Sequence, residues 1–322
     1  MLCGRTSKRG LAMRAIGFDD FGGVDVLKIV DLPEPHARSG QVRIRVAAAG
    51  LLISDTFVRT GTWIQELGSE RPIVVGWDVA GVVDEVGPGA GGRLSVGDVV
   101  IALPNSYAGK GAQAEYVVTE AESVVHAPRG SSFVEAATLL LNGLTARLMI
   151  DALELESAST IAVTGAAGSV GGFVVELAKS EGYRVVADAK PQDRELVAEL
   201  GADVIVDRSD DFAAAVVETV GRVEGLIDAA DIGDSLTAAV ADGHTAVSAR
   251  YREGVAARGV QWKKVFTPDY RTDTAALEKI RDAAQAGILT LRVADTYLPQ
   301  HAAEAYQRLE AGGLHGRLVF TF

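Results

Sequence analysis

Small residues in the stretch 161–182 occur in the order that the pyrophosphate of a dinucleotide requires. A buried-strand pattern, IAVTG, runs into AAGSVGG and then into the helical pattern FVVELAKSEG. A small residue at Ala166 allows a sharp turn, Gly168 lets the backbone approach the phosphates, and Gly171 lets the helix pack on its strand. The start of the helix offers N–H groups and a positive dipole end to an anion. Such glycines also serve plain strand-to-helix packing, but the flanking strand and helix favour a dinucleotide site.

The end of the next predicted strand, YRVVADA, bears on the choice between NAD and NADP. An NAD enzyme usually places a carboxylate there, on the ribose hydroxyls. This sequence has Ala189 followed by Lys190, and Asp188 should point to the opposite side of the strand. Lys190, Arg194 and Arg208 could form a cationic pocket for a 2′-phosphate, so we expect NADPH rather than NADH. Two alternatives stay open: a one-residue shift would make Asp188 the ribose ligand, and the cations could be solvated loop charges.

The elements that must position this loop follow from hydrophobic periodicity. From residue 13 to 133, short β-rich runs such as QVRIRVAAAG and PIVVGWDVAGVVDEVG, broken by Gly and Pro, predict a mostly β domain. From 134 to 287, helical patterns alternate with six buried-strand runs, which predicts a doubly wound parallel sheet. Its last helix should cover 274–286 and end at Gly287. The tail, 288–322, has the pattern strand, helix, strand, and residues 1–12 are expected to be a loose extension.

Composition narrows the class of partner. A chain of 322 residues is long enough for two domains. Its net charge of −12 argues against nucleic acid and against an anionic membrane face, because affinity for both comes from Lys and Arg. We find no run of about 20 apolar residues, the length that a membrane helix needs. The single cysteine, Cys3, excludes a disulfide framework within the chain, so a reducing cytoplasm is the expected compartment.

Several motifs, in order, resemble those of quinone oxidoreductases, a zinc-independent branch of the medium-chain dehydrogenase/reductase superfamily. They are GFDDFGGVDVLKIVDLPEPHARSGQVRIRVAAAGLL, GWDVAGVVDEVGPG, GDVVIAL, AEYVV, NGLTA, VTGAAGSVGG and GGLHGRLVF. The resemblance covers residues 13–322. It implies a Rossmann domain, 134–287, inserted in a GroES-like β-rich substrate domain, 13–133 completed by 288–322. The active site would lie in the cleft between them, and we expect a homodimer that acts on a small electrophilic molecule.

The same resemblance bears on zinc. Zinc-dependent alcohol dehydrogenases of the superfamily would show Cys in place of Leu52 and a His-Glu pair in place of Trp77 and Asp78. Neither Leu nor Trp can bind zinc, and the four-cysteine structural lobe is missing, so we expect no metal. The zinc-independent branch usually carries Asn in place of Leu52 and Pro in place of Ile53. This chain therefore lacks an amide that the resemblance would place in the substrate cleft.

Without a metal, the expected chemistry is hydride transfer from NADPH to a quinone or to the β-carbon of an α,β-unsaturated carbonyl. The protein would hold the two reactants in place, exclude water and offer a donor to the developing oxyanion. The candidates for the substrate cleft are Leu52, Asp55, Trp63, Trp77, Tyr107 and Gln113. The candidates for cofactor binding are Thr145, Ala166, Gly168, Ser169, Val170, Gly171, Lys190, Arg208, Ser248 and Phe266.

Alternatives to these roles remain. No proton donor is assigned, because Asp55 could instead be a buried acceptor for backbone N–H groups. Trp63 and Trp77 could be core residues, since large aromatic side chains are usually well buried. The whole protein could also be a nucleotide-binding protein of the same fold, with a sensing or structural role and little turnover.

Overall fold

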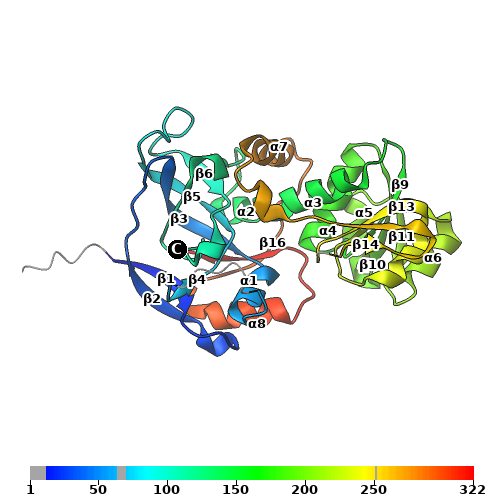
Figure 1. The fold of residues 1–322 in the computed structure, drawn as a ribbon, viewed down its shortest axis with the longest axis horizontal. Helices are drawn as coiled ribbons and strands as arrows, with labels where there is room; N and C mark the ends of the chain where they lie inside the picture. Colours follow the sequence, from blue (N-terminus) through cyan, green and yellow to red (C-terminus); the bar gives the residue numbers. More distant parts are fainter. Residues whose placement is uncertain (1–11, 64–69, 251) are drawn as a thin grey trace, which may run out of the picture.

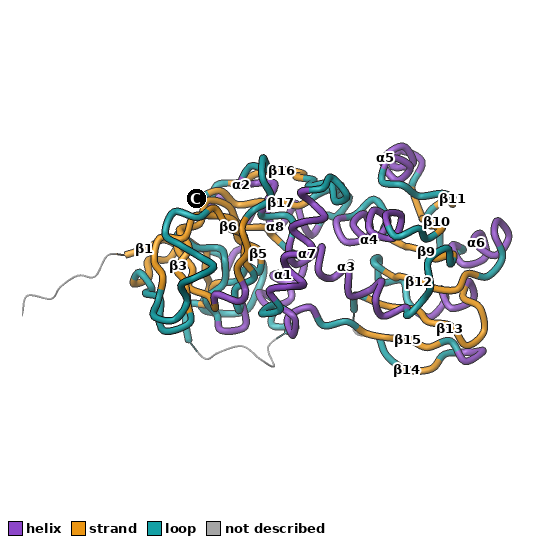
Figure 2. Tube along the Cα trace, turned by 90° about the horizontal axis from the view of Figure 1, so that it is seen from above, coloured by secondary structure: helices purple, strands orange, loops and turns teal. Residues whose placement is uncertain are grey.

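The computed structural model describes residues 12–63, 70–250 and 252–322. The expected extension therefore lies outside the described residues, Cys3 included, except for Ala12, where the first strand begins. The described chain forms two lobes side by side along the long axis (Figure 1). One lobe is rich in β-strands and contains both ends of the described chain, and the other is built from its middle. The view from above shows the same two lobes, with α1, α3 and α7 between their sheets (Figure 2).

The β-rich lobe holds two sheets. The smaller has the order β2-β1-β4, and the larger has the order β16-β17-β3-β5-β6-β8, with β7 also paired to β3. β17 lies antiparallel to β3, with Leu318 opposite Leu51, so the tail of the chain completes the sheet that the first part begins. The strands are β1 Ala12–Phe18, β2 Lys28–Pro33, β3 Gln41–Leu51, β4 Ile73–Val74, β5 Asp78–Val86, β6 Val99–Ala102, β7 Tyr116–Glu120, β8 Val124–His126, β16 Val293–Tyr297 and β17 Arg317–Thr321. The helices of this lobe are α1 Ile53–Arg59, α2 Phe133–Ala136 and α8 Ala302–Glu310.

The other lobe confirms the predicted doubly wound sheet. Its order is β11-β10-β9-β12-β13-β15-β14, and the six predicted strands pair in parallel, while the short β14 is antiparallel. The strands are β9 Thr160–Thr164, β10 Arg184–Ala189, β11 Val204–Asp207, β12 Val223–Asp228, β13 Val240–Ser248, β14 Gly254–Val255 and β15 Gln261–Lys264. The helices are α3 Leu140–Leu153, α4 Ser169–Ser180, α5 Arg194–Glu199, α6 Phe212–Val220 and α7 Thr274–Gln285. The chain order reverses between β9 and β12, which is where ligands bind in sheets of this type.

Short 3-10 helices join these elements. They are η1 Val24–Val26, η2 Ser106–Ala108, η3 Ala121–Ser123, η4 Pro191–Asp193, η5 Asp234–Ala239, η6 Ala257–Gly259, η7 Thr267–Tyr270 and η8 Pro299–His301. The run PIVVGWDVAGVVDEVG is not one strand, because Gly76, with a φ of 113°, turns the chain between β4 and β5. The predicted helix over 274–286 is present as α7, and the Asp273 side chain caps it by accepting the Ala276 N–H.

One apolar stretch meets the length and composition of a membrane span, which we did not expect from the sequence. It is Phe133–Leu153, 21 residues that contain an 18-residue window with a mean hydropathy of 1.4. In the fold this stretch is two helices, α2 and α3, and 61% of its most apolar window is buried inside the protein. α3 packs against α4 and α7. Burial between the lobes accounts for its apolar composition, as for the core helix of a folded domain.

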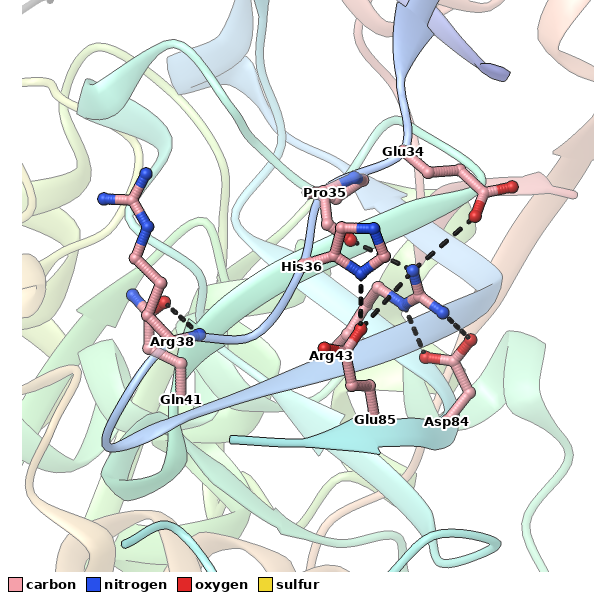
Figure 3. A network of polar contacts seen from close by, with 8 residues as sticks. All are labelled: Glu34, Pro35, His36, Arg38, Gln41, Arg43, Asp84 and Glu85. Atoms are coloured by element: carbon pink, nitrogen blue, oxygen red, sulfur yellow. Dashed lines mark hydrogen bonds and ion pairs between the residues drawn. The ribbon is translucent and has the colours of Figure 1, made fainter. Parts of the chain in front are cut away.

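The connection from β2 to β3 is fixed to β5 by one arginine (Figure 3). The Nε and Nη2 atoms of Arg43 each donate to an Asp84 carboxylate oxygen at 2.9 Å, and Nη1 donates to the Pro35 carbonyl at 3.0 Å. Carboxylate oxygens of Glu34 and Glu85 lie 3.6 and 3.5 Å from Nη1. The hydrogen bond to Asp84 raises the pKa of Arg43. This bidentate pair links β3 to β5 and to the segment that precedes β3.

Candidate functional site

The small-residue loop follows β9 and opens α4, as predicted. Gly165 has a φ of 68°, in the left-handed region, and Gly168 precedes the first helical residue, Ser169. A Cβ at Gly171 would approach the Gly165 carbonyl oxygen far more closely than 3.0 Å, so only glycine fits there. A Cβ at Gly168 would meet a single atom, that same carbonyl oxygen, at 3.1 Å, and otherwise open space. The loop is therefore packed on its inner side and open above Gly168.

The first turn of α4 offers hydrogen-bond donors to this open space. Gly168 has no side chain that could accept from the N–H groups of Ser169, Val170 and Gly171. These groups have no acceptor within the helix, because intrahelical bonds begin four residues later. The positive end of a 12-residue helix adds to their attraction for an anion. The loop therefore fits the pyrophosphate of a dinucleotide.

Asp188 contacts the loop, so the side of the strand opposite to Ala189 is the one that faces the loop. Its Oδ1 accepts the Ala166 N–H at 3.0 Å, and the side chain is buried beneath the loop. Its Oδ2 is also buried, has no hydrogen-bond partner and lies 3.6 Å from Arg208 Nε. Residues 188 and 189 alternate across the strand, and the face of residue 188 is the one turned to the loop. The alternative in which Asp188 binds the ribose therefore stays open.

The three predicted cations have different surroundings. Arg194 pairs with Asp207 at 2.7 Å and also donates to the Ile205 carbonyl, so its charge is partly neutralised. Lys190 is exposed, and among the described residues no carboxylate lies within 4 Å of its ammonium group. The Arg208 side chain is 43% exposed, and the Arg208 backbone N–H donates to the Ala189 carbonyl. Lys190 and Arg208 thus stand at the carboxyl ends of adjacent strands, β10 and β11, with donors available to an anion.

A cavity of about 220 Å³ lies between the two lobes. The β-rich lobe contributes Leu52, Ile53, Ser54, Trp63, Trp77 and Tyr107. The other lobe contributes Leu141, Thr145, Val170, Ala229, Ala230, Asp231, Ala249, Arg250, Val265, Thr267 and Pro268. Four of the predicted cleft residues therefore line one cavity together with two predicted cofactor residues, Thr145 and Val170. Val170 belongs to the first turn of α4, so the dinucleotide loop and the cavity adjoin.

Aromatic side chains form one wall of this cavity. The Tyr107 ring lies 4.7 Å from the Trp77 ring at 80° and 6.4 Å from the Trp63 ring at 72°. Phe266, from the other lobe, stacks on Tyr107 at 6.4 Å and 20°. Edge-to-face and stacked pairs of this kind hold the rings in place. A flat, apolar molecule would fit this wall.

Asp55 and Gln113 do not line the cavity. Asp55 is fully buried, and its Oδ2 accepts the Leu52 N–H at 3.0 Å and the Gln113 Nε2 at 3.2 Å. Burial raises the pKa of Asp55 to about 7, although Arg317 nearby lowers it. Gln113 in turn accepts from the Tyr306 hydroxyl at 3.2 Å. These side chains fix the start of α1 and lie behind the cavity wall.

Ser248 also lies below the cavity surface. Its side chain is fully buried, and its hydroxyl accepts the Arg250 N–H at 3.0 Å. Thr145 is held by two hydrogen bonds of 2.7 Å, one to the Leu141 carbonyl and one shared with the Thr267 hydroxyl. These contacts place Thr145 at the junction of α3 and η7, on the part of the cavity wall that the other lobe forms.

Four polar residues of the cavity were not singled out from the sequence: Ser54, Asp231, Arg250 and Thr267. The Arg250 guanidinium lies 4.5 Å from the Phe57 ring centroid, and its Nε is 3.9 Å from Asp231 Oδ2. The Ser54 hydroxyl is buried without a hydrogen-bond partner. Asp231 and Arg250 follow β12 and β13 directly, so the rule that ligands bind at the carboxyl ends of strands would have indicated them. No sequence signal marks Ser54.

Asp228 orders the loop that carries Asp231. It is fully buried at the end of β12, and its Oδ1 accepts from the Thr164 hydroxyl at 2.8 Å. The same carboxylate accepts the N–H groups of Ala230, Ile232 and Gly233. One buried side chain thus ties the end of β9 to the turn after β12, where the two halves of the sheet meet.

Of the three positions that the resemblance linked to zinc, Leu52 and Trp77 line the cavity and Asp78 lies behind it. Leu52 and Trp77 are buried there, and the Trp77 Nε1 has no hydrogen-bond partner. Asp78 is held by Arg317 at 3.0 Å and by the Leu141 N–H at 2.9 Å. Within the described ranges, no three His, Cys, Asp or Glu side chains are grouped so that they could hold a metal ion.

Comparisons with known proteins identify the family. The Alcohol dehydrogenase GroES-like domain family matches residues 38–129. A protein named Quinone-oxidoreductase QR1, chloroplastic, of Triphysaria versicolor is 33% identical over 220 residues, which are 66% of this chain and 66% of that protein. The NADPH-dependent alkenal/one oxidoreductase, chloroplastic, of Arabidopsis thaliana is 37% identical over 203 residues, 61% of this chain and 52% of that protein. The chain thus spans about two thirds and about half of these relatives.

Solved structures match over nearly the whole chain. The quinone oxidoreductase from Coxiella burnetii has a TM-score of 0.86 and 25% identity, and the match covers 97% of this chain and all of that one. The mycobacterial protein Rv1454c, solved in complex with NADPH, has a TM-score of 0.84 and 28% identity, with 96% and 100% covered. The two lobes and the loop after β9 therefore define a nicotinamide-dinucleotide oxidoreductase fold. The chain belongs to the quinone oxidoreductase-like branch of the medium-chain dehydrogenase/reductase superfamily.

Proposed function

We propose that the protein is an NADPH-dependent, zinc-independent reductase of quinones or α,β-unsaturated carbonyl compounds. One observation carries the proposal: the first turn of the dinucleotide-binding helix α4 and the aromatic wall of the other lobe line the same cavity. The names of the relatives support it, since they describe a quinone oxidoreductase and an NADPH-dependent alkenal/one oxidoreductase. The same names do not favour the alternative of a nucleotide binder with little turnover.

The residues that would hold the cofactor fit its charges. The N–H groups of Ser169, Val170 and Gly171 would bind the pyrophosphate, and Lys190 and Arg208 would bind the 2′-phosphate. Asp188 acts in the opposite direction, because its Oδ2, which makes no hydrogen bond and lies 3.6 Å from Arg208 Nε, would repel a 2′-phosphate and suit a ribose hydroxyl. The choice of NADPH rests on the two cations and on the names of the relatives.

The cavity would position the acceptor and respond to its developing charge. A bound reduced nicotinamide supplies the hydride, and the acceptor's oxygen gains negative charge as the hydride arrives. Trp63, Trp77 and Tyr107 exclude water from this space. Ser54 and Arg250 both line the cavity, and the Arg250 guanidinium packs over the ring of Phe57, which lies three residues after Ser54 on α1. We assign these two groups, Arg250 and Ser54, to the acceptor's oxygen.

Domain division, metal content, assembly and location belong to the same proposal. We propose that residues 13–133 and 288–322 form one domain and residues 134–287 the other. The sheets support this division, since β1–β8 and β16–β17 fall in the first domain and β9–β15 in the second. Leu52 and Trp77 support independence from zinc. We further propose that the protein is a cytoplasmic homodimer. It should bind neither nucleic acid nor membranes, and the net charge of −12 supports this last part of the proposal.

Oxidation of NADPH with two probes, 1,4-benzoquinone and but-3-en-2-one, tests the proposal. We expect turnover with at least one probe, the same rate after dialysis against a chelator, and a lower kcat/KM with NADH. Tight binding of NADPH without turnover of either probe would leave a nucleotide-binding protein instead. Activity lost in chelator and restored by zinc would contradict the role given to Leu52 and Trp77.

A further inference from the structure

Arg292 lies in the segment between α7 and β16 and reaches the dinucleotide loop from below. Its Nη1 donates to the Ala167 carbonyl at 3.0 Å, and its Nη2 donates to the Gly168 carbonyl at 2.7 Å. The planar guanidinium fork thus binds two successive carbonyl groups of the loop. The Arg292 backbone is fixed as well, because its carbonyl accepts the Arg317 N–H at the start of β17.

One of these two bonds orients a free donor of the loop, because the Gly168 N–H, in the same peptide as the Ala167 carbonyl, already donates to the Gly165 carbonyl at 2.9 Å. In a trans peptide the C=O and N–H groups point in opposite directions. Because Arg292 holds the Gly168 carbonyl on the inner side, the Ser169 N–H of the same peptide faces outward, toward the open space above the loop. The Gly168 carbonyl also accepts the Gly172 N–H, so its direction is fixed by two donors.

The charge of Arg292 is not neutralised by an adjacent carboxylate. Across the described residues none lies within 4 Å of its guanidinium, and its Nε is buried without a partner. Burial lowers the pKa of Arg292, while the more distant Glu176 raises it. Glu176 instead accepts the Thr290 N–H, which anchors this segment to α4. A guanidinium stays protonated even when buried, so a weakly screened positive charge lies directly beneath the loop.

Gly172 provides independent support. A Cβ at this position would lie far closer than 3.0 Å to Arg292 Nη2. The absence of a side chain on this turn of α4 is what allows the guanidinium to reach the loop carbonyls.

We propose that Arg292 is a positioning residue for the cofactor's pyrophosphate: it orients the Ser169 N–H and adds a buried positive charge behind the loop. This inference rests on the proposed function, because it needs a dinucleotide at the loop. It assigns a binding role to the segment before β16, which the loop motif does not include. Loss of Arg292 should weaken pyrophosphate binding and leave the adenosine end of the site unchanged.

Four variants of the full chain test the inference: Arg292→Met, Arg292→Lys, Gly172→Ala and, as a matched control, Arg59→Met. Arg59 is also buried, donates to the Gly22 carbonyl and pairs with Glu310 in the β-rich lobe. Dissociation constants are measured for the dinucleotide that wild type binds more tightly and for its fragment without pyrophosphate, 2′-AMP for NADPH or adenosine for NADH. Urea unfolding reports the stability of each variant.

Arg292→Met should raise the dinucleotide Kd by roughly 10- to 100-fold and change the fragment Kd by less than about twofold. The dinucleotide Kd of Arg292→Lys should lie between those of wild type and Arg292→Met, because the charge stays and the bidentate geometry is lost. Gly172→Ala should weaken dinucleotide binding although alanine favours the helix. Arg59→Met should lower stability and leave both constants unchanged.

Three results would overturn the inference. One is equal dinucleotide affinity in wild type and Arg292→Met. The second is an equal loss of dinucleotide and fragment affinity, which would indicate general loosening of the fold. The third is a comparable loss in Arg59→Met. A wild type that binds neither NADPH nor NADH would overturn the proposed function and this inference with it, so the two failures are distinguishable.

Discussion

The Asp188 carboxylate accepts the backbone N–H of Ala166 at 3.0 Å, which joins the end of β10 to the small-residue loop after β9. One oxygen of the carboxylate is thereby occupied, and the other lies 3.6 Å from Arg208 Nε without a hydrogen bond. A carboxylate and a cation thus meet where the adenosine ribose of a dinucleotide would lie. Their balance decides between NAD and NADP.

Lys190→Ala and Arg208→Ala should each weaken NADPH binding by roughly 10- to 100-fold, because each removes a charge-assisted hydrogen bond to the 2′-phosphate. NADH binding should hardly change. Asp188→Asn keeps an acceptor for the Ala166 N–H and removes the negative charge, so it should tighten NADPH binding. Dissociation constants for both nucleotides test this assignment of NADPH. A wild type that binds NADH more tightly than NADPH, together with weaker NADH binding in Asp188→Asn, would assign NADH instead.

Gly168→Val should abolish dinucleotide binding and leave the chain folded. The new side chain would extend into the open space above the loop, since its Cβ meets only the Gly165 carbonyl oxygen, at 3.1 Å. Gly171→Ala is the contrasting variant: its Cβ would clash with that same carbonyl, so it should lower the free energy of unfolding. Binding by fluorescence and unfolding in urea separate the two effects. A folded Gly168→Val protein with unchanged NADPH affinity would refute the loop assignment.

Asp55 should make the protein less stable as the pH rises. Burial raises its folded-state pKa to about 7, whereas the unfolded value is about 3.9. Between these values the folded state binds a proton that the unfolded state has lost, so this contribution to the free energy of unfolding falls by up to about 1.4 kcal/mol per pH unit. The Asp55 contribution to the free energy of unfolding has its full value below pH 4 and is absent above pH 7.

Asp55→Asn isolates this contribution, because the amide resembles the protonated carboxyl. Wild type and variant share the neighbouring Asp78, Arg317 and Tyr306, so titration of those groups largely cancels in the comparison. The difference in free energy of unfolding, wild type minus variant, should fall as the pH rises from 5 to 7. Parallel curves over that range would mean that Asp55 is ionised in the folded protein.

Arg250→Met should lower kcat/KM for an enone or quinone by roughly 10- to 1000-fold, as removal of a donor to a developing oxyanion does in other enzymes. Arg250→Lys should retain part of the activity. Binding of NADPH should stay within about threefold of wild type, because the guanidinium serves the acceptor. Equal losses of NADPH affinity and kcat/KM would place Arg250 at the cofactor instead.

Periodicity in the sequence predicted the parallel sheet and the loop. The six strands are short buried runs flanked by helices, and the Ala166-Gly168-Gly171 spacing is local, so both are visible without tertiary contacts. The division of PIVVGWDVAGVVDEVG by Gly76 was not visible, because the positive φ depends on the approach of the backbone at Ala112 and Gln113. Local pattern therefore gives the elements and misses the turns that neighbouring segments impose.

Some residues of the site could likewise be predicted from the sequence, and others could not. Leu52, Trp63, Trp77 and Tyr107 were predicted for the cleft from resemblance, and all four line the cavity. Asp55 is a buried acceptor for the Leu52 N–H, which is the alternative that the sequence left open beside a place in the cleft. Arg250 and Arg292 gain their positions only when distant segments meet across the lobes. Charged residues of that kind look like solvated loop charges in the sequence.

Transfer of a hydride from the nicotinamide ring to the acceptor is the central claim, and an isotope label follows it directly. The protein is mixed with but-3-en-2-one and NADPH that carries deuterium on both positions of C4, and the reduced ketone is analysed by mass spectrometry and NMR. The account predicts one deuterium at the β-carbon and a proton from water at the α-carbon. A reduced ketone without deuterium at the β-carbon, or no reduced ketone from this enone and no reduction of 1,4-benzoquinone, would contradict it.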